Sequence, residues 1–279
     1  MKIILSRKGF DCENGGYASP VLPNGKLISL PIPSSDVIKY SDLKLDDNKS
    51  YFDLMKELKP KIKYNKEWCE LTKETKCHLD PDIYVDILKR DRDWKASFGQ
   101  INQSQSHLLN EGVREGDLFL FFGWFRQTIL NNGKLCFDKS APDLHILFGY
   151  LQIGKIIQVN NKTKIPKWMK FHPHAVDEDR IKTSTNTIYV TRKNLTWDEG
   201  LSGAGIFRFN KELVLTKEGL SRSKWGLPDF FKQVKISYHS EKSWKPEGYF
   251  KSVDKGQEFV IENNEDVENW AKSIIKNNS

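Results

Sequence analysis

The sequence predicts an α+β fold with a curved, mostly antiparallel sheet and several short helices. Long apolar segments typical of strands lie at 116–125 and 144–159. The Asn132-Gly133 pair between them offers a tight turn, which favours antiparallel pairing. Short amphipathic segments precede these strands, and 265–277 has helical spacing of its apolar residues.

The first part of the chain predicts a strand, a hairpin and short helices. KIILS is a strand-like run, and an Asn-Gly turn divides two apolar runs within 19–33. In DPDIYVDILKR, Asp80 is a suitable N-cap and Pro81 suits the first helical position. Helices are therefore predicted over 51–59, 80–90 and 103–112.

The later part predicts mainly strands, ending in the helix over 265–277. We expect one domain over 1–279, with a helical insert at about 40–112 and a β-rich part at about 113–240. The polar stretch 160–185 is a long connection, of a kind that is usually either functional or loose. Strands are predicted over 116–125, 133–137, 144–159, 186–192, 204–209 and 234–239.

Composition indicates a soluble, cytoplasmic protein. The 279 residues include 29% charged and 38% hydrophobic ones, which is ordinary for a globular domain. No apolar run is long enough to span a membrane, and Ile3 to Leu5 is too short for a signal-peptide core. The four cysteines have no CxxC spacing, so free thiols are expected rather than a disulfide frame or a zinc site.

The net charge of +7 and the pI near 9.0 favour a polyanionic partner, because lysine and arginine neutralise phosphates. A lysine-rich surface with no such partner is the alternative. We expect DNA to be the partner and no membrane to be involved.

A mixture of charges follows the first strand. Ser6, Arg7, Lys8 and Asp11 precede a Gly15-Gly16 pair. The two cations could hold a phosphate, the carboxylate could face a reacting sugar, and the glycines would let backbone approach closely. Lys8 could instead be an amine nucleophile. An Arg–Asp surface pair with a turn behind it is the structural alternative.

Two further stretches carry candidate site residues. In CHLDPDIY, the alternating His78, Asp80 and Asp82 could supply a carboxylate base or bind a divalent metal, although helix capping explains both aspartates equally well. In FGQINQSQSH, the helical spacing of Gln100, Gln103 and His107 predicts one polar face, whose amides could read a base edge.

The remaining histidines are less specific. His172 and His174 flank a proline, which extends the chain and can direct the two rings to opposite sides. Two histidines are too few for a catalytic zinc. His145 lies in an apolar strand, where a hydrogen-bonded core histidine is expected.

The aromatic residues of GDLFLFFGWF could stack on a base, and Trp124 and Phe125 are the candidates for this role. Most of the aromatic residues in this segment are expected in the core. With the following LHILFGYLQIGKII, the segment resembles barrel strands of PUA-like domains, including the EVE branch, which hold a flipped or modified base.

Several common motifs are absent from the sequence. It has no GxxxxGK[ST], GxGxxG, GxSxG or HExxH, which removes support for P-loop hydrolysis, dinucleotide chemistry and the commonest hydrolase sites. Group addition needs an activated donor, and the absence of cofactor motifs therefore argues against it. We expect no cofactor and assign no metal, although metal binding at His78, Asp80 and Asp82 stays open.

Taken together, these stretches resemble the third nucleotide-modification-associated domain family. The motifs that carry the resemblance are SRKGFD with GG, HLDPD, FGQ with Gln103 and His107, GDLFLFFGWF, HILFGYLQIG and HPH, and they run from residue 1 to about 240. The family groups prokaryotic and phage proteins linked to modified DNA bases, so the resemblance implies contact with modified nucleotides.

With group addition unsupported, excision, hydrolysis or binding remain. The sequence analysis favours a DNA glycosylase that excises a modified base in defence against phages. Asp11, Asp80 or Asp82 would be the carboxylate, with His107 assisting. Residues expected to contact substrate are Ser6, Arg7, Lys8, Gly15, Gly16, His78, Gln100, Gln103, Trp124, Phe125 and His172.

Two alternatives remain open. One is a non-catalytic reader of modified bases, and the other is a metal-dependent nuclease that uses His78, Asp80 and Asp82.

Overall fold

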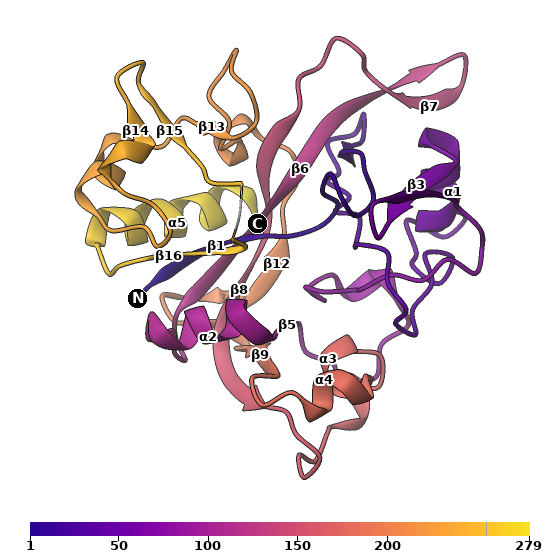
Figure 1. Ribbon diagram of the computed structural model, residues 1–279, viewed down its shortest axis with the longest axis horizontal. Helices are drawn as coiled ribbons and strands as arrows, with labels where there is room; N and C mark the ends of the chain where they lie inside the picture. The colour runs from indigo at the N-terminus through magenta and orange to yellow at the C-terminus, as the bar shows by residue number, and fades with distance from the viewer. Residues whose placement is uncertain (255) are drawn as a thin grey trace.

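One large sheet organises the molecule (Figure 1). The computed structural model describes residues 1–254 and 256–279. The sheet follows the order β16-β1-β6-β8-β9-β5, with β12 beside β8, and β2 and β7 beside β6. Its strands are β1 (Ile3–Arg7), β2 (Ser19–Val21), β5 (Ser97–Gln100), β6 (Leu118–Asn131), β7 (Lys134–Phe137), β8 (Leu144–Gln158), β9 (Thr187–Thr191), β12 (Ala204–Ile206) and β16 (Glu258–Ile261).

The two longest strands, β6 and β8, pair antiparallel at the centre of this sheet. Consecutive residues Leu118–Phe122 of β6 are all buried, because elements cover both faces of the sheet there. β1 and β2 pair parallel with β6, and the other pairs of this sheet are antiparallel. The predicted α+β class with a mostly antiparallel sheet is therefore confirmed.

The sheet is curved but is not closed into a barrel. The edge strands β16 and β5 are linked by side chains, because Gln100 Nε2 donates a hydrogen bond to Glu258 Oε1 at 2.8 Å. No backbone ladder joins these two strands among the described residues. A PUA-like barrel is therefore not confirmed.

Smaller elements surround the sheet. Two hairpins pair β3 (Lys61–Tyr64) with β4 (Glu67–Glu70) and β10 (Asn194–Leu195) with β11 (Asp198–Ser202). A three-stranded sheet has the order β13 (Lys224–Trp225), β15 (Tyr249–Lys251) and β14 (Trp244–Lys245). The helices are α1 (Tyr51–Leu58), α2 (Asn102–Asn110), α3 (Pro173–Val176), α4 (Glu178–Lys182) and α5 (Glu265–Asn278). Short 3₁₀ turns lie at Val85–Ile87, Lys167–Met169, Lys211–Leu213, Asp229–Gln233 and Glu241–Ser243.

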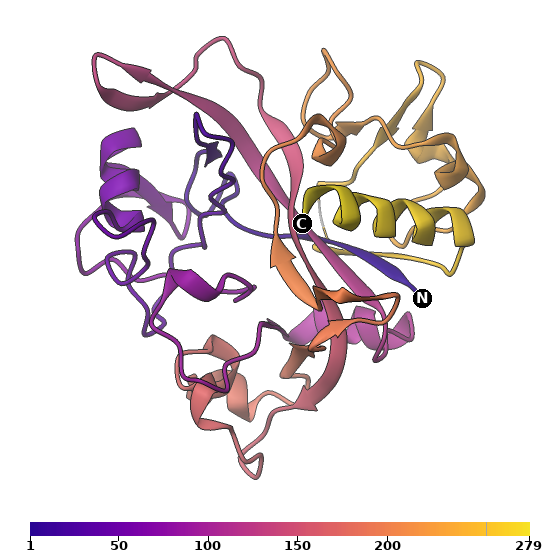
Figure 2. The ribbon, with the colours of Figure 1, turned by 180° about the vertical axis from the view of Figure 1, so that it is seen from behind.

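Three hydrophobic cores stabilise these layers. The main core packs the central strands with α2 and α5, and Figure 2 shows α5 from behind, alongside β1. A second core joins α1 to the N-terminal loops. A third, small core lies under α3 and α4 and includes Val159 and Ile188. The second and third cores flank the segment 78–82.

Most of the predicted elements are present. The helices over 51–59, 103–112 and 265–277 are confirmed, as are the strands over 116–125, 133–137, 144–159, 186–192 and 204–209, within a few residues at their ends. His145 is buried, and its Nδ1 accepts a hydrogen bond from Trp225 Nε1 at 3.0 Å, as expected for a core histidine. No helix among the described residues is long and apolar enough to cross a membrane.

Two predicted elements are wrong. The segment 234–239 forms only a single bridge, between Ile236 and Ile261. The segment 80–90 is not a helix, because the backbone N–H and C=O of Asp82 pair with Ser97 at the edge of β5. Those groups are then unavailable to a helix, and only the short turn Val85–Ile87 remains.

Asp82 has a structural role at this edge. Its carboxylate is buried and accepts two hydrogen bonds from the Arg90 guanidinium, and Trp94 Nε1 donates a third at 3.3 Å. Burial raises the pKa of Asp82, and the Arg90 charge opposes that rise.

We expect Asp82→Asn to lower the free energy of unfolding by about 3 kcal/mol, because it leaves the buried Arg90 cation without its counter-ion. Urea denaturation measures this loss. Asp86→Asn, which changes an exposed carboxylate of the same segment, should stay within about 0.5 kcal/mol of the parent. Equal stability of the two variants would show that the Asp82–Arg90 pair does not support the fold.

Candidate functional site

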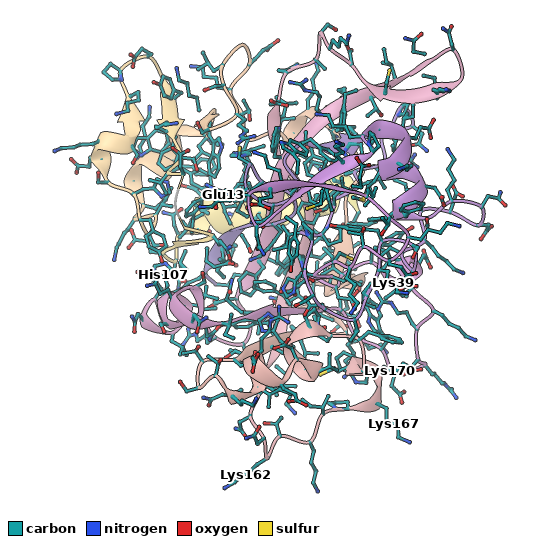
Figure 3. The ribbon with its side chains drawn as sticks, turned by 45° about the vertical axis from the view of Figure 1, so that its right-hand side comes forward. Glu13, Lys39, His107, Lys162, Lys167 and Lys170 are labelled. Atoms are coloured by element: carbon teal, nitrogen blue, oxygen red, sulfur yellow. The ribbon has the colours of Figure 1, made fainter. Side chains whose placement is uncertain are left out.

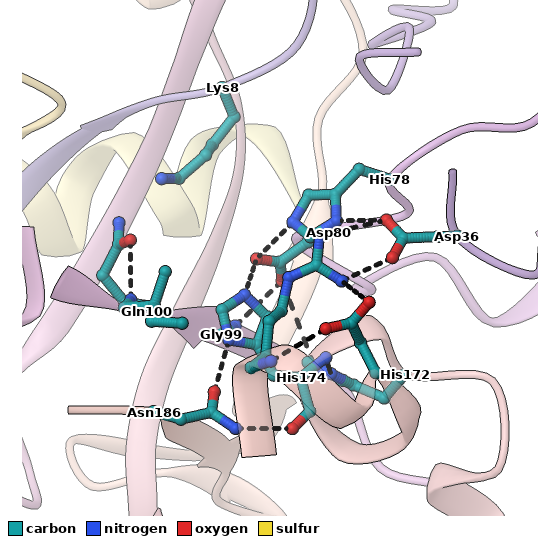
Figure 4. Close-up of polar contacts among 12 residues, drawn as sticks. Lys8, Asp36, His78, Asp80, Gly99, Gln100, His172, His174 and Asn186 are labelled. Carbon is teal, nitrogen blue, oxygen red and sulfur yellow. Dashed lines mark hydrogen bonds and ion pairs between the residues drawn. The ribbon is translucent and has the colours of Figure 1, made fainter. Parts of the chain in front are cut away.

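Three histidines converge on one aspartate below the curved sheet (Figure 4). His78 Nε2 and His174 Nε2 lie 3.7 and 3.8 Å from Asp80 Oδ2. His172 Nε2 lies 4.0 Å from Asp80 Oδ1. We call these four residues the histidine–aspartate centre.

The carboxylate of Asp80 is withdrawn from solvent, with 4% of its side chain exposed. Its Oδ1 accepts a hydrogen bond of 2.9 Å from the backbone N–H of Gly99 on β5. Burial acts to raise the pKa of Asp80, but the surrounding imidazoles, His78 foremost, outweigh burial and hold that pKa below its usual value. Asp80 is therefore ionised at neutral pH.

His78 is oriented from behind by a second carboxylate. Its Nδ1 lies 2.7 Å from Asp36 Oδ2, and Asp36 in turn accepts hydrogen bonds from Arg180 on α4 and from Ser34 Oγ. Burial opposes ionisation of Asp36, yet His78 and Arg180 hold its pKa well below the usual range. Burial lowers the pKa of His78, and the carboxylates of Asp36 and Asp80 raise it above the usual value.

His174 is oriented by an amide. Asn186 Nδ2 donates to the His174 carbonyl at 2.9 Å, which turns Asn186 Oδ1 toward His174 Nδ1 at 2.8 Å. An amide oxygen only accepts, so His174 Nδ1 carries the proton and its Nε2 presents a lone pair to the centre. Burial lowers the pKa of His174 to about 4, so the ring is neutral at pH 7.

His172 has the opposite tautomer. It is the N-cap of α3, and its Nδ1 accepts from the backbone N–H of His174 at 3.2 Å. The proton of the neutral ring therefore lies on Nε2, which is buried and has no hydrogen-bond partner among the described residues. Burial lowers the pKa of His172 to about 3. His172 thus directs an N–H donor toward Asp80.

Local sequence explains how these rings reach one point. Pro173 starts the short helix α3, and its fixed φ suits a first helical position. The turn of α3 directs both His172 and His174 toward Asp80, so the sequence-based expectation that they would point to opposite sides is wrong. Gly99 lets the His174 ring lie directly against β5, where any Cβ would overlap the ring.

The centre is mostly enclosed. His78 is its most exposed member, at 15% of the side chain. A cavity of about 50 Å³ adjoins Asp80 and Pro81 and is lined further by Tyr84 and Phe148.

Other predicted residues form a second buried group. Lys8 Nζ pairs with Glu258 Oε1 at 2.7 Å and lies 4.4 Å from the centroid of the Phe98 ring. Gln100 donates to the same Glu258 oxygen, and Ser6 is fully buried nearby in β1, at the register position opposite Glu258. Lys8 and Gln100 are thus brought together, but each is engaged with Glu258 and not with a free surface.

The rest of the N-terminal stretch makes structural contacts. Arg7 donates to the carbonyls of Val253 and Asp254. Asp11 is exposed and closes a turn by accepting from the N–H groups of residues 13 and 14. Gly15 and Gly16 have φ of +85° and +80°, and the ring of Phe10 packs where a Gly15 Cβ would be. In this arrangement none of these four residues contacts the histidine–aspartate centre.

The remaining predicted residues also lie elsewhere. Phe125 is fully buried in the main core and offers no face to a base. Trp124 is stacked by the Arg222 guanidinium at 4.0 Å. Gln103 is exposed on α2, and His107 bonds Ser237 Oγ at 2.9 Å. The predicted common face of Gln100, Gln103 and His107 does not form, because Gln100 belongs to β5 and precedes the helix.

Sequence reasoning missed several members of the site. Asp36, Asn186 and Arg180 lie in unremarkable polar segments, and only the fold brings them to the centre. The sequence places His174 beside a proline but gives it no role in a site. The signal that could have found it is the pairing of the HLD and HPH stretches, each of which contributes a histidine two residues from a second chemically active side chain.

The fold and this site define a class: a mixed α+β protein, dominated by sheet, that carries a buried histidine–aspartate centre. The family model described as nucleotide modification associated domain 3 matches residues 2–262. The chain therefore belongs to that family, which confirms the resemblance drawn from its motifs and associates the protein with nucleotide modification. No curated protein and no solved structure matches the chain.

We expect Gly99→Ala to displace the His174 ring without unfolding the protein, because the added methyl occupies the ring's position and Gly99 has no positive φ. Long-range ¹H–¹⁵N spectra of the histidine rings should show changed His174 signals and a weakened Nδ1–H contact with Asn186. Gly226→Ala is the matched control, since its Cβ would meet no atom closer than 3.5 Å. Unchanged His174 signals in Gly99→Ala would contradict the close packing on β5.

Proposed function

We propose that the protein is a DNA glycosylase that excises a modified base, acting in defence against phages with altered DNA. The single observation that carries the proposal is Asp80, an ionised carboxylate held away from solvent among three imidazoles. Membership of a family associated with nucleotide modification supports modified DNA as the substrate class.

The chemistry requires little beyond these groups. Water supplies an oxygen that bonds to C1′ of the sugar, while the C1′–N bond breaks and its electron pair leaves with the base. A desolvated carboxylate stabilises the positive charge that develops on the sugar, or takes the proton of the attacking water. The His172 Nε2–H is a donor directed toward Asp80 Oδ1, and it suits an oxygen atom of the substrate or of water.

Positive charge is available beside the centre for the phosphate backbone. The connection that leads into α3 carries four exposed lysines, of which Lys170 pairs at the surface with Asp91 at 3.0 Å. Figure 3 shows Lys162, Lys167 and Lys170 at the periphery of the molecule. Phe171 is also exposed, at 39%. The predicted phosphate-binding role of Arg7 and Lys8 receives no such support, since both are held in internal contacts. The four exposed lysines of the connection into α3 are Lys162, Lys164, Lys167 and Lys170.

A metal-dependent nuclease is the second candidate. The ligand atoms of His78, Asp80 and His174 lie within 4.8 Å of one another, which favours metal-assisted hydrolysis. Asp82, which the sequence suggested as a third ligand, is engaged with Arg90 instead. A non-catalytic reader of modified bases has less support, because it has no use for an ionised, enclosed carboxylate.

We expect Asp80→Asn to reduce base release from modified DNA at least about 100-fold, because the neutral amide neither stabilises a cationic sugar nor accepts a proton. The assay is mass spectrometry of released bases, with alkali-dependent strand breaks as a second readout. Asp86→Asn is the control.

Three outcomes would contradict this proposal. Base release that falls with Asp11→Asn but not with Asp80→Asn would move the active carboxylate to the N-terminal loop. Strand cleavage without base release would favour the nuclease. Intact DNA with retained binding would favour the reader.

We further expect that replacing the four lysines between residues 162 and 170 by glutamine weakens DNA binding and flattens its salt dependence. The slope of log K against log salt should fall by about 0.9 for each lysine that contacts a phosphate. Fluorescence anisotropy across a salt series measures this slope. A charge-matched control replaces exposed lysines of the C-terminal part, and equal slopes for both variants would place the DNA elsewhere. The control residues are Lys211, Lys232, Lys235 and Lys242.

A further inference from the structure

The spacing within the histidine–aspartate centre does not fit direct hydrogen bonds. His78 Nε2 and His174 Nε2 lie 3.7 and 3.8 Å from the same oxygen, Asp80 Oδ2, whereas N–H···O bonds are about 2.7–3.2 Å long. Two ligand atoms at about 2.1 Å from one cation in tetrahedral geometry lie about 3.4 Å apart. The two nitrogen–oxygen separations are therefore close to the edge of a coordination shell, and the ligand atoms of all three residues lie within 4.8 Å of one another.

The Nδ1 atoms of both rings are occupied by hydrogen bonds, so the Nε2 atoms of His78 and His174 are the ones that face the shared space. His78 Nδ1 is bonded to Asp36 and His174 Nδ1 to Asn186. A carboxylate or carbonyl behind each imidazole is the usual arrangement of metal-binding histidines, because it fixes the tautomer and raises ligand basicity. Asp36 is fixed in turn by Arg180.

A second observation points into the same space. His172 Nε2 is buried, carries a proton and has no partner among the described residues. It is directed toward Asp80 Oδ1 at 4.0 Å. An N–H in this position can donate a hydrogen bond to an oxygen ligand of a bound ion. His172 is not itself a ligand, because its Nε2 carries the proton.

We propose that His78, Asp80 and His174 bind one divalent first-row transition-metal ion, with Asp36 and Asn186 as positioning residues. Two imidazoles and one carboxylate suit iron, manganese, cobalt or zinc better than magnesium or calcium, which prefer oxygen ligands. Three protein ligands leave further positions open for water or substrate. No metal is assigned from the sequence alone. His174 lies far from His78 and Asp80 in the sequence, and only the fold brings the three ligands together.

Metal binding does not depend on the proposed glycosylase activity. Only its consequence does: an ion bound at Asp80 would polarise the attacking water, so hydrolysis by that water would require the metal.

The test is a Co²⁺ titration of the full-length protein after EDTA treatment and removal of the chelator. We expect one equivalent to bind, with visible absorption bands of protein-bound Co²⁺ and a higher melting temperature. Asp80→Ala should weaken binding at least about 100-fold, and Asn186→Ala about 10- to 100-fold, as for other outer partners of metal ligands. His239→Gln, which changes a histidine outside the centre, is the control and should bind like the parent.

Gly99→Ala keeps every ligand and displaces only the His174 ring, so it covers the case in which Asp80→Ala fails to fold. We expect it to lose the Co²⁺ bands. No Co²⁺ binding by the parent, or equal binding by the parent and either Asp80→Ala or Gly99→Ala, would overturn the proposal.

The base-release assay with and without EDTA separates this inference from the proposed function. Base release that is unaffected by EDTA would leave the glycosylase standing and overturn a catalytic metal. Co²⁺ binding without base release would support the metal site and overturn the glycosylase.

Discussion

The antiparallel pairing of β6 with β8 fixes the position of β9 and β5, the strands beside the candidate site. These strands are long, and their paired portions are buried on both faces, so their register is strongly determined. β9 pairs antiparallel with β8, and β5 pairs antiparallel with β9. The backbone N–H of Gly99 therefore meets Asp80 at a position that the sheet determines.

The centre combines segments that belong to different cores. Asp36 and His78 extend from the N-terminal core, His172 and His174 from the small core under α3 and α4, and Gly99 from the edge of the main sheet. Each imidazole is oriented by a hydrogen bond at its Nδ1, while its Nε2 faces Asp80. Such preorganisation lowers the cost of holding an ionised carboxylate out of water.

Local patterns could predict the elements but not their meeting point. β6 and β8 follow from the sequence because each is a long apolar run. α5 follows because its apolar residues recur at helical spacing. The Asp-Pro-Asp stretch at 80–82 has the same signals as a helix start, and only the long-range pairing of Asp82 with Ser97 overrides them. Asp36 and Asn186 carry no local signal at all, because hydrogen bonding to a histidine depends on tertiary contact.

The Arg180–Asp36 ion pair joins residues 144 positions apart. Closing a loop of this length costs conformational entropy, which the contacts around the centre must offset. During synthesis the N-terminal core can assemble while Asp36 and His78 still face water, and their desolvation waits for the segment through Asn186. The centre is therefore complete only when the chain through Asn186 is present, because a fragment that stops before α4 lacks Arg180 and Asn186, the partners of Asp36 and His174.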